Sequence, residues 1–292
     1  MSMKIRFIIN PISGGGKHKN ILDLLEKNID IKRFDYDCVF TERSKHATEL
    51  SKKAADNNID IVVAVGGDGT MHECAKGVLG SKTALAVLPC GSGNGFALHF
   101  KMESELENAI IQLNSCEFRT IDSCTANGIP FFNVSGVGFD AHIAKLFATT
   151  KVRGFMTYVK LVLRECAFYP AQQYKLEYDG KTETHKAVII SWANATQFGN
   201  NAQISPESKV DDGLVDICVL KDFNRLKVPL LLYRLFTKRI QHSKYMKIIR
   251  TKSMKISCQN GISHLDGEGV DLGSSILINT VPKSLNIFVP HG

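Results

Sequence analysis

Apolar positions follow two alternating patterns through the first 125 residues of the chain. Short, continuous apolar runs predict strands buried on both faces of a sheet, and they lie at 4–9, 36–40, 60–65 and 84–88. Between these runs, apolar residues three or four positions apart predict amphipathic helices. One helical face carries Ile21, Leu24, Leu25 and Ile29, a second carries Ala47, Leu50, Ala54 and Ala55, and a further helix is expected at about 103–114. This alternation predicts a parallel sheet with helices on both faces.

From about residue 126, short alternating or apolar segments are separated by turn residues, which favours a mostly antiparallel β domain. The expected strands are 131–135, 174–179, 186–192, 214–220, 253–258, 276–279 and 285–289, and Trp192 is expected in the β core. Helical insertions are expected near 141–167 and 223–241. We therefore predict domains over 1–125 and 126–292, and leave open whether the last strand returns to the first domain.

Composition narrows the class of protein. Hydrophobic residues make up 44% of the chain, and no run of 18 apolar residues is present, so we expect a globular core and no transmembrane helix. The segment Lys4–Ile9 is too short and too charged for a signal peptide. The eight cysteines form no CxxC pair and several lie in apolar runs, which indicates reduced residues in a cytoplasmic protein and argues against a zinc site.

The net charge of +7 is unevenly spread. Residues 221–255 contain eleven Lys and Arg residues and one acid, Asp222. Such a segment suits phosphates, nucleic acid or an anionic membrane, or it forms a solvated helix face. The interleaved apolar residues 230–233 and 235–236 favour a membrane. We therefore expect peripheral membrane association and no nucleic-acid partner, and leave a homodimer open.

Three glycine-rich segments, at 13–16, 66–69 and 91–95, each follow a predicted strand. Ligands of parallel sheets bind beyond the carboxyl ends of the strands, so we expect the three segments at one edge of the sheet. The stretch Gly66-Gly67-Asp68-Gly69-Thr70 leads into a predicted helix, whose N-terminal N–H groups suit a phosphate. A carboxylate repels phosphates, so Asp68 either holds a cation, accepts a proton, or is a solvated turn residue.

Common nucleotide motifs do not fit these segments. A Walker A loop at Ser13–His18 would need Ser or Thr after the lysine and Gly five residues before it, but the chain has His18 and Ile12. The segment Gly91–Phe96 lacks the third glycine of the dinucleotide fingerprint. Residues 17–19 either steer ATP or begin a solvated helix. The sequence therefore indicates a nucleotide site of a different design.

Further blocks occur in a fixed order along the chain. They are Asn10-Pro11 with Gly14–Gly16, Thr41, Gly66–Thr70, Pro89–Asn94, Asn133 with Gly136–Ala141, Asp211–Asp216 and Asp266–Glu268. With these blocks the chain resembles the diacylglycerol kinase catalytic family, which includes bacterial lipid kinases and sphingosine kinases. The resemblance spans nearly the whole chain. No single block identifies the family, but the blocks together are highly specific for it.

The resemblance implies an α/β N-terminal domain, a β-sandwich C-terminal domain, and an ATP- and Mg²⁺-dependent lipid kinase of phospholipid biosynthesis that converts diacylglycerol to phosphatidic acid. Phosphoryl transfer needs Mg²⁺ over the phosphate charge and a group that receives the hydroxyl proton. The resemblance gives the first task to Asp68 and the second to Glu268, as catalytic residues. Without it, Glu268 would be interpreted as an exposed turn acid.

The resemblance also implies three sets of ligand-binding residues. Those implied to contact ATP are Asn10, Pro11, Ser13, Thr41, Gly66, Gly67, Asp68, Gly69, Thr70, Met71, His72, Glu73, Gly91, Ser92 and Asn94. Asp122 and Asp140 are implied members of an acid network near the substrate, and a structural Mg²⁺ would take the Asp212 carboxylate with the Lys209 and Leu214 carbonyls. Taken alone, Asp122 and Asp140 are more typical of caps and turns, and Asp212-Gly213 is a common turn dipeptide.

The second glycine loop departs from many bacterial members of the family. They carry Gly-Thr-x-Asn-Asp where this chain has Gly91–Gly95, so Ser92 keeps the hydroxyl and Gly95 removes a carboxylate. This form is more similar to the sphingosine kinases and raises a sphingoid base as the acceptor. An NAD kinase shares the Gly-Gly-Asp-Gly-Thr loop, but the Asp-Asp-Gly-Leu and Asp-Gly-Glu blocks argue against it. The intact Asp68 and Glu268 argue against the last alternative, a non-catalytic lipid- or nucleotide-binding protein.

Overall fold

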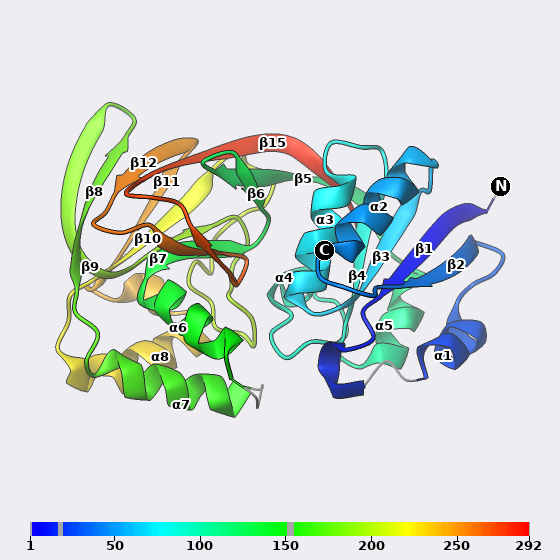
Figure 1. The fold of residues 1–292 in the computed structure, drawn as a ribbon, viewed down its shortest axis with the longest axis horizontal. Coiled ribbons are helices and arrows are strands. Elements are labelled where there is room, and N and C mark those ends of the chain that lie inside the picture. Colours follow the sequence, from blue (N-terminus) through cyan, green and yellow to red (C-terminus); the bar gives the residue numbers. More distant parts are fainter. Residues whose placement is uncertain (1, 17–19, 151–154, 292) are drawn as a thin grey trace. The chain divides into compact units, whose positions relative to one another are not determined.

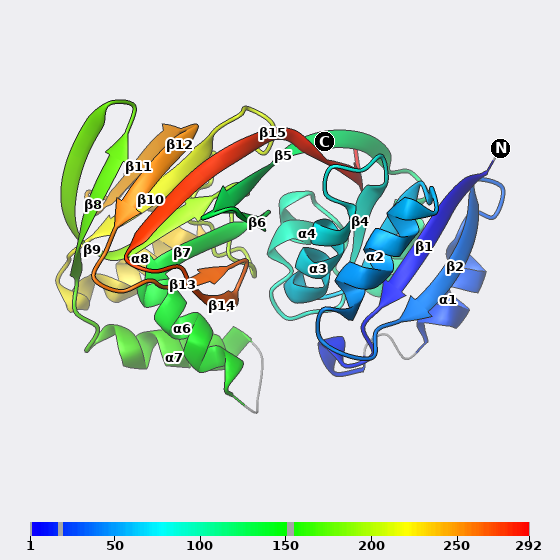
Figure 2. The same ribbon diagram turned by 45° about the horizontal axis from the view of Figure 1, so that its top comes forward.

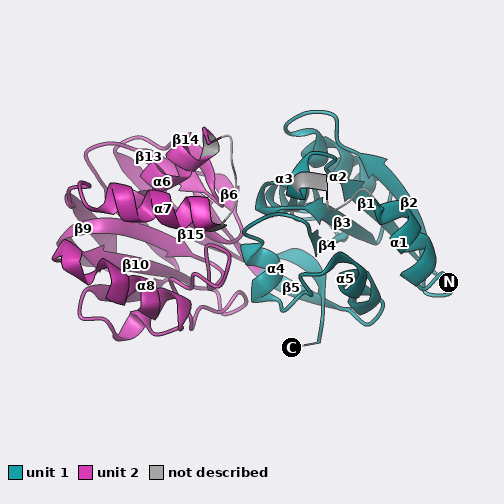
Figure 3. Cartoon of the chain, turned by 90° about the horizontal axis from the view of Figure 1, so that it is seen from below, with its two compact units in different colours: residues 1–121, 283–292 teal, residues 122–282 magenta. Residues whose placement is uncertain are grey.

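The computed structural model describes residues 2–16, 20–150 and 155–291 (Figure 1). The chain forms two compact units (Figure 3). Unit 1 contains residues 1–121 and 283–292, and unit 2 contains residues 122–282. Strands β5 (Glu117–Ala126) and β15 (Ser275–Val289) each have residues in both units.

Unit 1 is built on a parallel sheet in the order β4–β3–β1–β2. Its strands are β1 (Met3–Ile9), β2 (Phe34–Phe40), β3 (Ile61–Gly66) and β4 (Ala84–Pro89). Every residue of β3 and β4 is buried, as their continuous apolar runs predict for central strands. The end of β15 pairs in parallel with β4, where Ile287 lies opposite Leu85.

Helices cover both faces of this sheet, α2 with α3 on one face and α1 with α5 on the other (Figures 1 and 3). They are α1 (Ile21–Asn28), α2 (His46–Asp56), α3 (Asp68–Val78), α4 (Gly95–His99) and α5 (Leu106–Leu113), with a 3₁₀ turn η1 at Ser13–Gly16. Helices α2 and α3 pack closely, because a Cβ at Gly77 would overlap the Ser51 hydroxyl. The predicted helices of the first 125 residues, and the parallel sheet that they cover, are confirmed.

Unit 2 is mostly antiparallel, as predicted. Its strands, apart from its parts of β5 and β15, are β6 (Ile129–Phe131), β7 (Val134–Gly138), β8 (Gln172–Tyr178), β9 (Lys181–Ala193), β10 (Val215–Lys221), β11 (Met246–Thr251), β12 (Ser253–Ser257), β13 (Ile262–Leu265) and β14 (Glu268–Asp271). Trp192 and Tyr174 are among the largest fully buried side chains of its core, so the expectation for Trp192 is confirmed.

The helical insertions form a separate layer of unit 2. Helices α6 (Phe139–Ala148) and α7 (Phe155–Cys166) come from the first insertion, of which residues 151–154 lie outside the described part. The second insertion forms η2 (Arg225–Lys227), α8 (Val228–Phe236) and η3 (Ile240–His242). Figure 2 shows α6 and α7 against one side of the strands, and their buried faces share an apolar cluster with α8, β9 and β10.

Two predicted strands differ from the structure. The strand expected at 131–135 begins at Val134 instead, because the N–H groups of Phe132 and Asn133 donate to the Asp266 side chain rather than to a neighbouring strand. The segments expected at 276–279 and 285–289 form the single strand β15, which continues through polar residues that contain Pro282. In the described part of the chain, no helix is both long and apolar enough to cross a membrane.

Candidate active site

The three glycine-rich loops of unit 1 meet at the carboxyl ends of their strands. The Asn10 N–H donates to the Val65 carbonyl at 3.0 Å, and the Cys90 N–H donates to the Gly66 carbonyl at 2.8 Å. The Asn10 side chain also donates to the Thr70 hydroxyl at 3.0 Å. The predicted convergence of the loops at one edge of the sheet is therefore confirmed.

Glycine is required where these loops touch. Gly14 has a φ of +63°, and a Cβ there would overlap the Cys90 carbonyl oxygen. A Cβ at Gly91 would stand 2.6 Å from the Gly67 Cα. The loops thus pack backbone against backbone, an arrangement that only glycine allows and that is typical of loops that bind phosphates. Residues 17–19, considered above for steering ATP, lie outside the described residues.

Helix α3 begins at Asp68, with Gly67 as its N-cap residue. The Gly67 carbonyl accepts the Met71 N–H at 3.0 Å, and no described side chain caps this N-terminus. The partial positive charge of a helix N-terminus favours an anion here. One Asp68 oxygen accepts the Phe96 N–H at 3.4 Å, and the other lies 2.9 Å from where a Cβ would stand at Gly93. Asp68 is therefore fixed between the second and third loops.

Other residues implied to contact ATP surround these loops. Ser13 donates to the Asn10 carbonyl at 3.2 Å. The Thr41 N–H donates to the Ile9 carbonyl at 2.9 Å, which places Thr41 directly after β2, although its side chain is buried. Pro11 and Ser92 are exposed. Asn94 fixes the third loop, since its side chain accepts the Gly91 N–H at 3.0 Å and donates to the Gly91 carbonyl at 2.8 Å.

Within α3, the implied residues fall into different environments. Thr70, Met71 and His72 are buried, whereas Gly69 is partly exposed in the first turn. The Glu73 carboxylate accepts the Lys45 N–H at 2.8 Å and the Ala47 N–H at 3.1 Å, so it caps the start of α2. Glu73 therefore has a structural role, since it joins α3 to the start of α2, besides the contact with ATP that the resemblance implies.

In unit 2, Asp140 is buried at the start of α6. Its Oδ1 accepts the Ala141 N–H at 2.8 Å, and its Oδ2 accepts the Ser191 hydroxyl at 2.6 Å. The His264 Nε2 lies 3.4 Å from the same Oδ2. A Cβ at Gly136 would overlap that oxygen, so the glycine leaves room for the carboxylate.

The Asp-Gly-Glu block forms a tight hairpin between β13 and β14. Leu265 pairs with Glu268, and the two turn residues Asp266 and Gly267 have φ angles of +49° and +92°. Positive φ at both central residues is typical of the type I′ hairpin turn that Asp-Gly favours. The buried Asp266 carboxylate accepts the N–H groups of Phe132 and Asn133, both at 2.9 Å.

Glu268 lies immediately after this turn. It is the first residue of β14 rather than a turn residue, and it is exposed. The Gly267 N–H donates to the His264 Nδ1 at 3.2 Å, so a buried side chain holds the backbone beside Glu268. The carboxylate therefore projects from a turn that is fixed at several points.

Asp122 contacts the segment that precedes β10. It is buried, its N–H donates to the Val210 carbonyl at 2.6 Å, and its carboxylate accepts the Gly213 N–H at 2.7 Å. The Asn194 side chain donates to the Asp122 carbonyl at 3.0 Å. Asp122 thus orders the 210–213 segment, which belongs to the metal site that the resemblance implies.

That metal site has a donor set suited to Mg²⁺. The Asp212 carboxylate is exposed, one of its oxygens accepts the Leu214 N–H at 3.0 Å, and Lys209 is also exposed. One carboxylate and two carbonyls are oxygen ligands that leave room for the waters Mg²⁺ retains. Within the described residues, no cluster of three or more His, Cys, Asp or Glu side chains forms a metal cage. The residues therefore fit a hydrated ion rather than an enclosed one.

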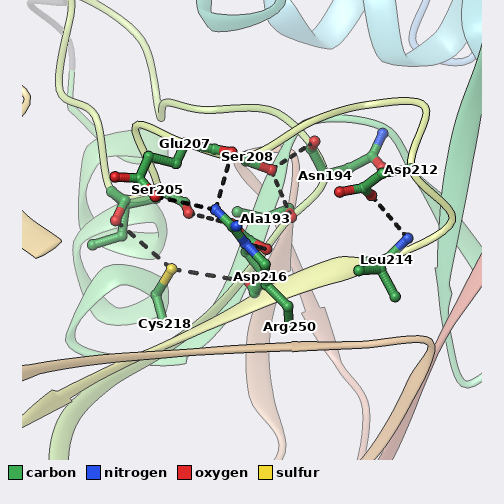
Figure 4. A network of polar contacts seen from close by, with 11 residues as sticks. Ala193, Asn194, Ser205, Glu207, Ser208, Asp212, Leu214, Asp216, Cys218 and Arg250 are labelled. Atoms are coloured by element: carbon green, nitrogen blue, oxygen red, sulfur yellow. Dashed lines mark hydrogen bonds and ion pairs between the residues drawn. The ribbon is translucent and has the colours of Figure 1, made fainter.

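The buried acid Asp216, to which sequence reasoning gave no role, supports the same segment (Figure 4). Asp216 accepts the Ser205 hydroxyl at 2.6 Å and pairs with the Arg250 guanidinium at 3.2 Å. Burial raises the pKa of Asp216, and the Ser205 and Arg250 contacts oppose that rise. Arg250 also donates to the Glu207 carbonyl at 3.1 Å. The sequence signals were its place at the end of the Asp211–Asp216 block and its position as an acid in an apolar strand.

An apolar cavity lies in unit 2 between the helical layer and the sheet. It has a volume of about 100 Å³ and is lined by apolar faces of α6, α7 and α8 and by residues of β9 and β10. Of the described lining residues, Asp140 is the one that carries a charge. Burial raises the pKa of Tyr158, which lines the same cavity. Sequence reasoning missed this cavity, although both helical insertions that wall it carry long apolar stretches.

Comparison with known proteins agrees with this architecture. Residues 4–126 match the model of the diacylglycerol kinase catalytic domain, and residues 133–289 match that of the YegS C-terminal NAD kinase beta sandwich-like domain. An uncharacterized protein from Synechocystis is 25% identical over 97% of this chain and 69% of its own length. A diacylglycerol kinase from Bacillus subtilis is 27% identical over 91% of this chain and 89% of its own.

A solved structure of a putative diacylglycerol kinase from Bacillus anthracis has the same fold, with a TM-score of 0.80 and 23% identity over 99% of this chain and 97% of its own. The chain combines an α/β unit that carries three glycine-rich loops with a β-sandwich unit that contains an apolar cavity. Together with the matched families, these features define an enzyme of the lipid kinase class. The chain belongs to the diacylglycerol kinase family. The family resemblance and the fold class are therefore confirmed.

Proposed function

We propose that this enzyme transfers the γ-phosphate of ATP to the free hydroxyl of diacylglycerol, giving phosphatidic acid for phospholipid biosynthesis, with Mg²⁺ as its metal. The apolar cavity of unit 2 is the observation that supports a lipid acceptor most directly. A hydrocarbon chain suits a cavity lined by apolar side chains, whereas a nucleoside acceptor such as NAD would need polar partners there. The family model of the N-terminal domain supports the same reaction.

The loops of unit 1 supply the features that ATP needs. Backbone N–H groups around Gly14, Gly67 and Gly91, and the N-terminus of α3, suit the phosphates. Asn10 and Thr70 hold one another in place beside them. When bound, Mg²⁺ neutralises charge on the transferring phosphate. Asp68, whose carboxylate accepts the Phe96 N–H, would hold that ion.

Glu268 would receive the proton of the lipid hydroxyl. It is an exposed carboxylate at the end of a hairpin turn that Asp266 and His264 hold rigidly. A proton acceptor on a rigid element keeps the geometry that proton transfer requires. Asp266 and His264 act in this account as positioning residues, since the Asp266 carboxylate and the His264 Nδ1 accept backbone N–H groups.

A sphingoid base is the second candidate acceptor. The loop Gly91–Gly95 favours it, and so does Asp140, because it is the charged residue among the described residues that line the apolar cavity, and a carboxylate there suits a cationic amine. The two acceptors therefore differ in one respect: a sphingoid base carries an amine that would contact Asp140, and diacylglycerol carries none.

In the test, purified enzyme is mixed with Mg²⁺ and labelled ATP. Each reaction contains one acceptor, which is dioctanoylglycerol, sphingosine or NAD. We expect label in dioctanoylglycerol, and a loss of about 10²- to 10⁴-fold in kcat for Glu268→Gln. The matched control Glu26→Gln, an exposed acid on α1, should retain activity. Preferential labelling of sphingosine would replace the acceptor, and label in NAD alone, or in no acceptor, would overturn the proposal.

A further inference from the structure

Helix α7 and the residue two positions past its end expose a row of large apolar side chains. Met156 is 63% exposed, Leu163 47% and Phe168 87%. Met156 and Leu163 are seven residues apart and so lie on one helical face, Phe168 follows the helix end, and Lys160 and Arg164 are exposed among them. The opposite face of the same helix, including Leu161, is buried against the apolar cluster. Helix α7 is therefore apolar on both sides.

The segment that contains α8 repeats this arrangement. Leu226 is 85% exposed, Leu230 44% and Tyr233 56%. Leu226 sits on the short turn η2, where Asn224 caps the turn by accepting the Leu226 N–H at 3.0 Å. The buried face of α8 packs inward through Leu231. Six large apolar side chains are thus exposed on α7, on α8 and on the residues that adjoin these helices, although both helices already bury an apolar face.

These two rows belong to one surface, which we name the α7–α8 face. Figure 3 shows α7 and α8 side by side on one side of unit 2. The Arg225 guanidinium donates to the Tyr169 carbonyl at 2.6 Å. Phe168 precedes Tyr169 and Leu226 follows Arg225, so this hydrogen bond joins the two segments that carry them. Both helices also wall the apolar cavity. The exposed apolar side chains therefore lie on, or directly beside, two helices that also wall the cavity.

The charge of the α7–α8 face is positive. From 226 to 239 the sequence has Lys227, Arg234, Lys238 and Arg239 and no acid. The acids that flank the face are engaged: Glu165 pairs with His142 and Arg164, and Asp222 pairs with Lys186 and Arg225. A face with aromatic and leucine tips ringed by Lys and Arg is typical of interfacial membrane binding.

We propose that the α7–α8 face docks on an anionic lipid bilayer, with Phe168 and Leu226 inserted among the lipids. A second copy of the chain is a poorer occupant, because a symmetric contact would place this positive surface against itself. Protein interfaces are also depleted in lysine at their centres. The path of the acceptor rests on the proposed function: the acceptor lipid would pass from the bilayer between α7 and α8 into the cavity.

Two kinds of variant separate the apolar and electrostatic contributions. Inserting one apolar side chain strengthens binding by about tenfold, so Phe168→Ser with Leu226→Ser should weaken vesicle affinity by about a hundredfold. Lys227→Glu with Lys238→Glu should weaken binding to vesicles that contain phosphatidylglycerol and leave binding to pure phosphatidylcholine little changed. These four residues lie outside the cavity lining, so they probe docking rather than acceptor binding.

The experiment is co-sedimentation of the full chain with vesicles of phosphatidylcholine, with and without phosphatidylglycerol, in the absence of ATP. Controls are Ile31→Ser, which removes an exposed apolar residue of unit 1, and Lys52→Glu on α2. We expect the face variants alone to lose binding. Unchanged binding, or an equal loss in the controls, would overturn the proposal, as would a dimer that the Phe168 and Leu226 variants dissociate without lipid.

An activity arm distinguishes docking from the proposed function. The Phe168→Ser, Leu226→Ser variant should keep its rate on monomeric dihexanoylglycerol and lose it on vesicles that contain long-chain diacylglycerol. An equal loss on both substrates would contradict docking as the role of the face. Absence of activity on either substrate in the wild-type chain would overturn the proposed function, while the vesicle result without ATP still decides the docking proposal.

Discussion

Replacing Asp266 by alanine is expected to destabilise the hairpin that presents Glu268. The Asp266 carboxylate accepts two N–H groups from buried backbone, those of Phe132 and Asn133. Its own N–H donates to the Ser135 hydroxyl at 3.0 Å. Alanine at this position would leave both backbone donors without their carboxylate acceptor.

The magnitude follows from two contributions. Each buried N–H that loses its acceptor costs about 1–3 kcal/mol, and alanine at a φ of +49° adds about 1 kcal/mol. The sum, about 3–7 kcal/mol, is a large part of the stability of an ordinary domain. Asp266→Asn keeps one acceptor oxygen and tolerates the left-handed conformation, so it should cost about 1–3 kcal/mol. Glu268→Gln should leave stability unchanged, because its side chain is exposed.

Trp192 makes this series measurable. It is the one tryptophan of the chain and is buried in the core of unit 2, so its fluorescence during urea unfolding reports on that unit. The midpoints should fall in the order wild type, then Asp266→Asn, then Asp266→Ala, with Glu268→Gln at the wild-type value. An Asp266→Ala midpoint equal to wild type would refute the assignment of Asp266 as the anchor of the hairpin.

Three further predictions test other parts of the structure. Gly14→Ala should weaken binding of a fluorescent ATP analogue at least about tenfold, because its Cβ overlaps the neighbouring loop, whereas Gly80→Ala carries the same positive φ without the overlap and should bind normally. Glu73→Ala should lower the thermal stability of unit 1 by about 1–2 kcal/mol through the lost cap of α2, seen by differential scanning calorimetry. A hydrogen bond from Lys247 lowers the pKa of Glu183 to about 2. Glu183→Gln should therefore destabilise the protein above about pH 4.3, and its melting temperature should meet that of wild type as the pH falls to about 2.

The parallel sheet and its glycine loops could be predicted from the sequence because the signals are local. The run Ile61–Val65 is continuous and apolar, and the glycines that follow it allow close approach of backbone. The β13–β14 hairpin escaped prediction because its strands are four residues long, and the second, Glu268–Asp271, is largely polar. Strand β5 escaped because its first four residues are exposed, which leaves no apolar run.

The site in unit 2 could be predicted only in part, because its contacts join residues far apart in the sequence. The resemblance singled out Asp140, but nothing local indicates Ser191 and His264 as its neighbours. The same holds for the pair of Asp216 with Arg250, which lie 34 residues apart. The apolar cavity combines three helices and the sheet, so no single stretch of sequence reveals it.

Product analysis of a single reaction tests the central claim most directly. Wild-type enzyme is mixed with Mg²⁺, γ-labelled ATP and equimolar dioctanoylglycerol and sphingosine, and the labelled products are separated and identified by mass. The account predicts label in dioctanoyl phosphatidic acid for wild type and a loss of that product in Asp68→Ala. Failure of the wild-type enzyme to transfer label to lipid would contradict this account. Labelling by Asp68→Ala that equals that by the wild-type enzyme would also contradict it.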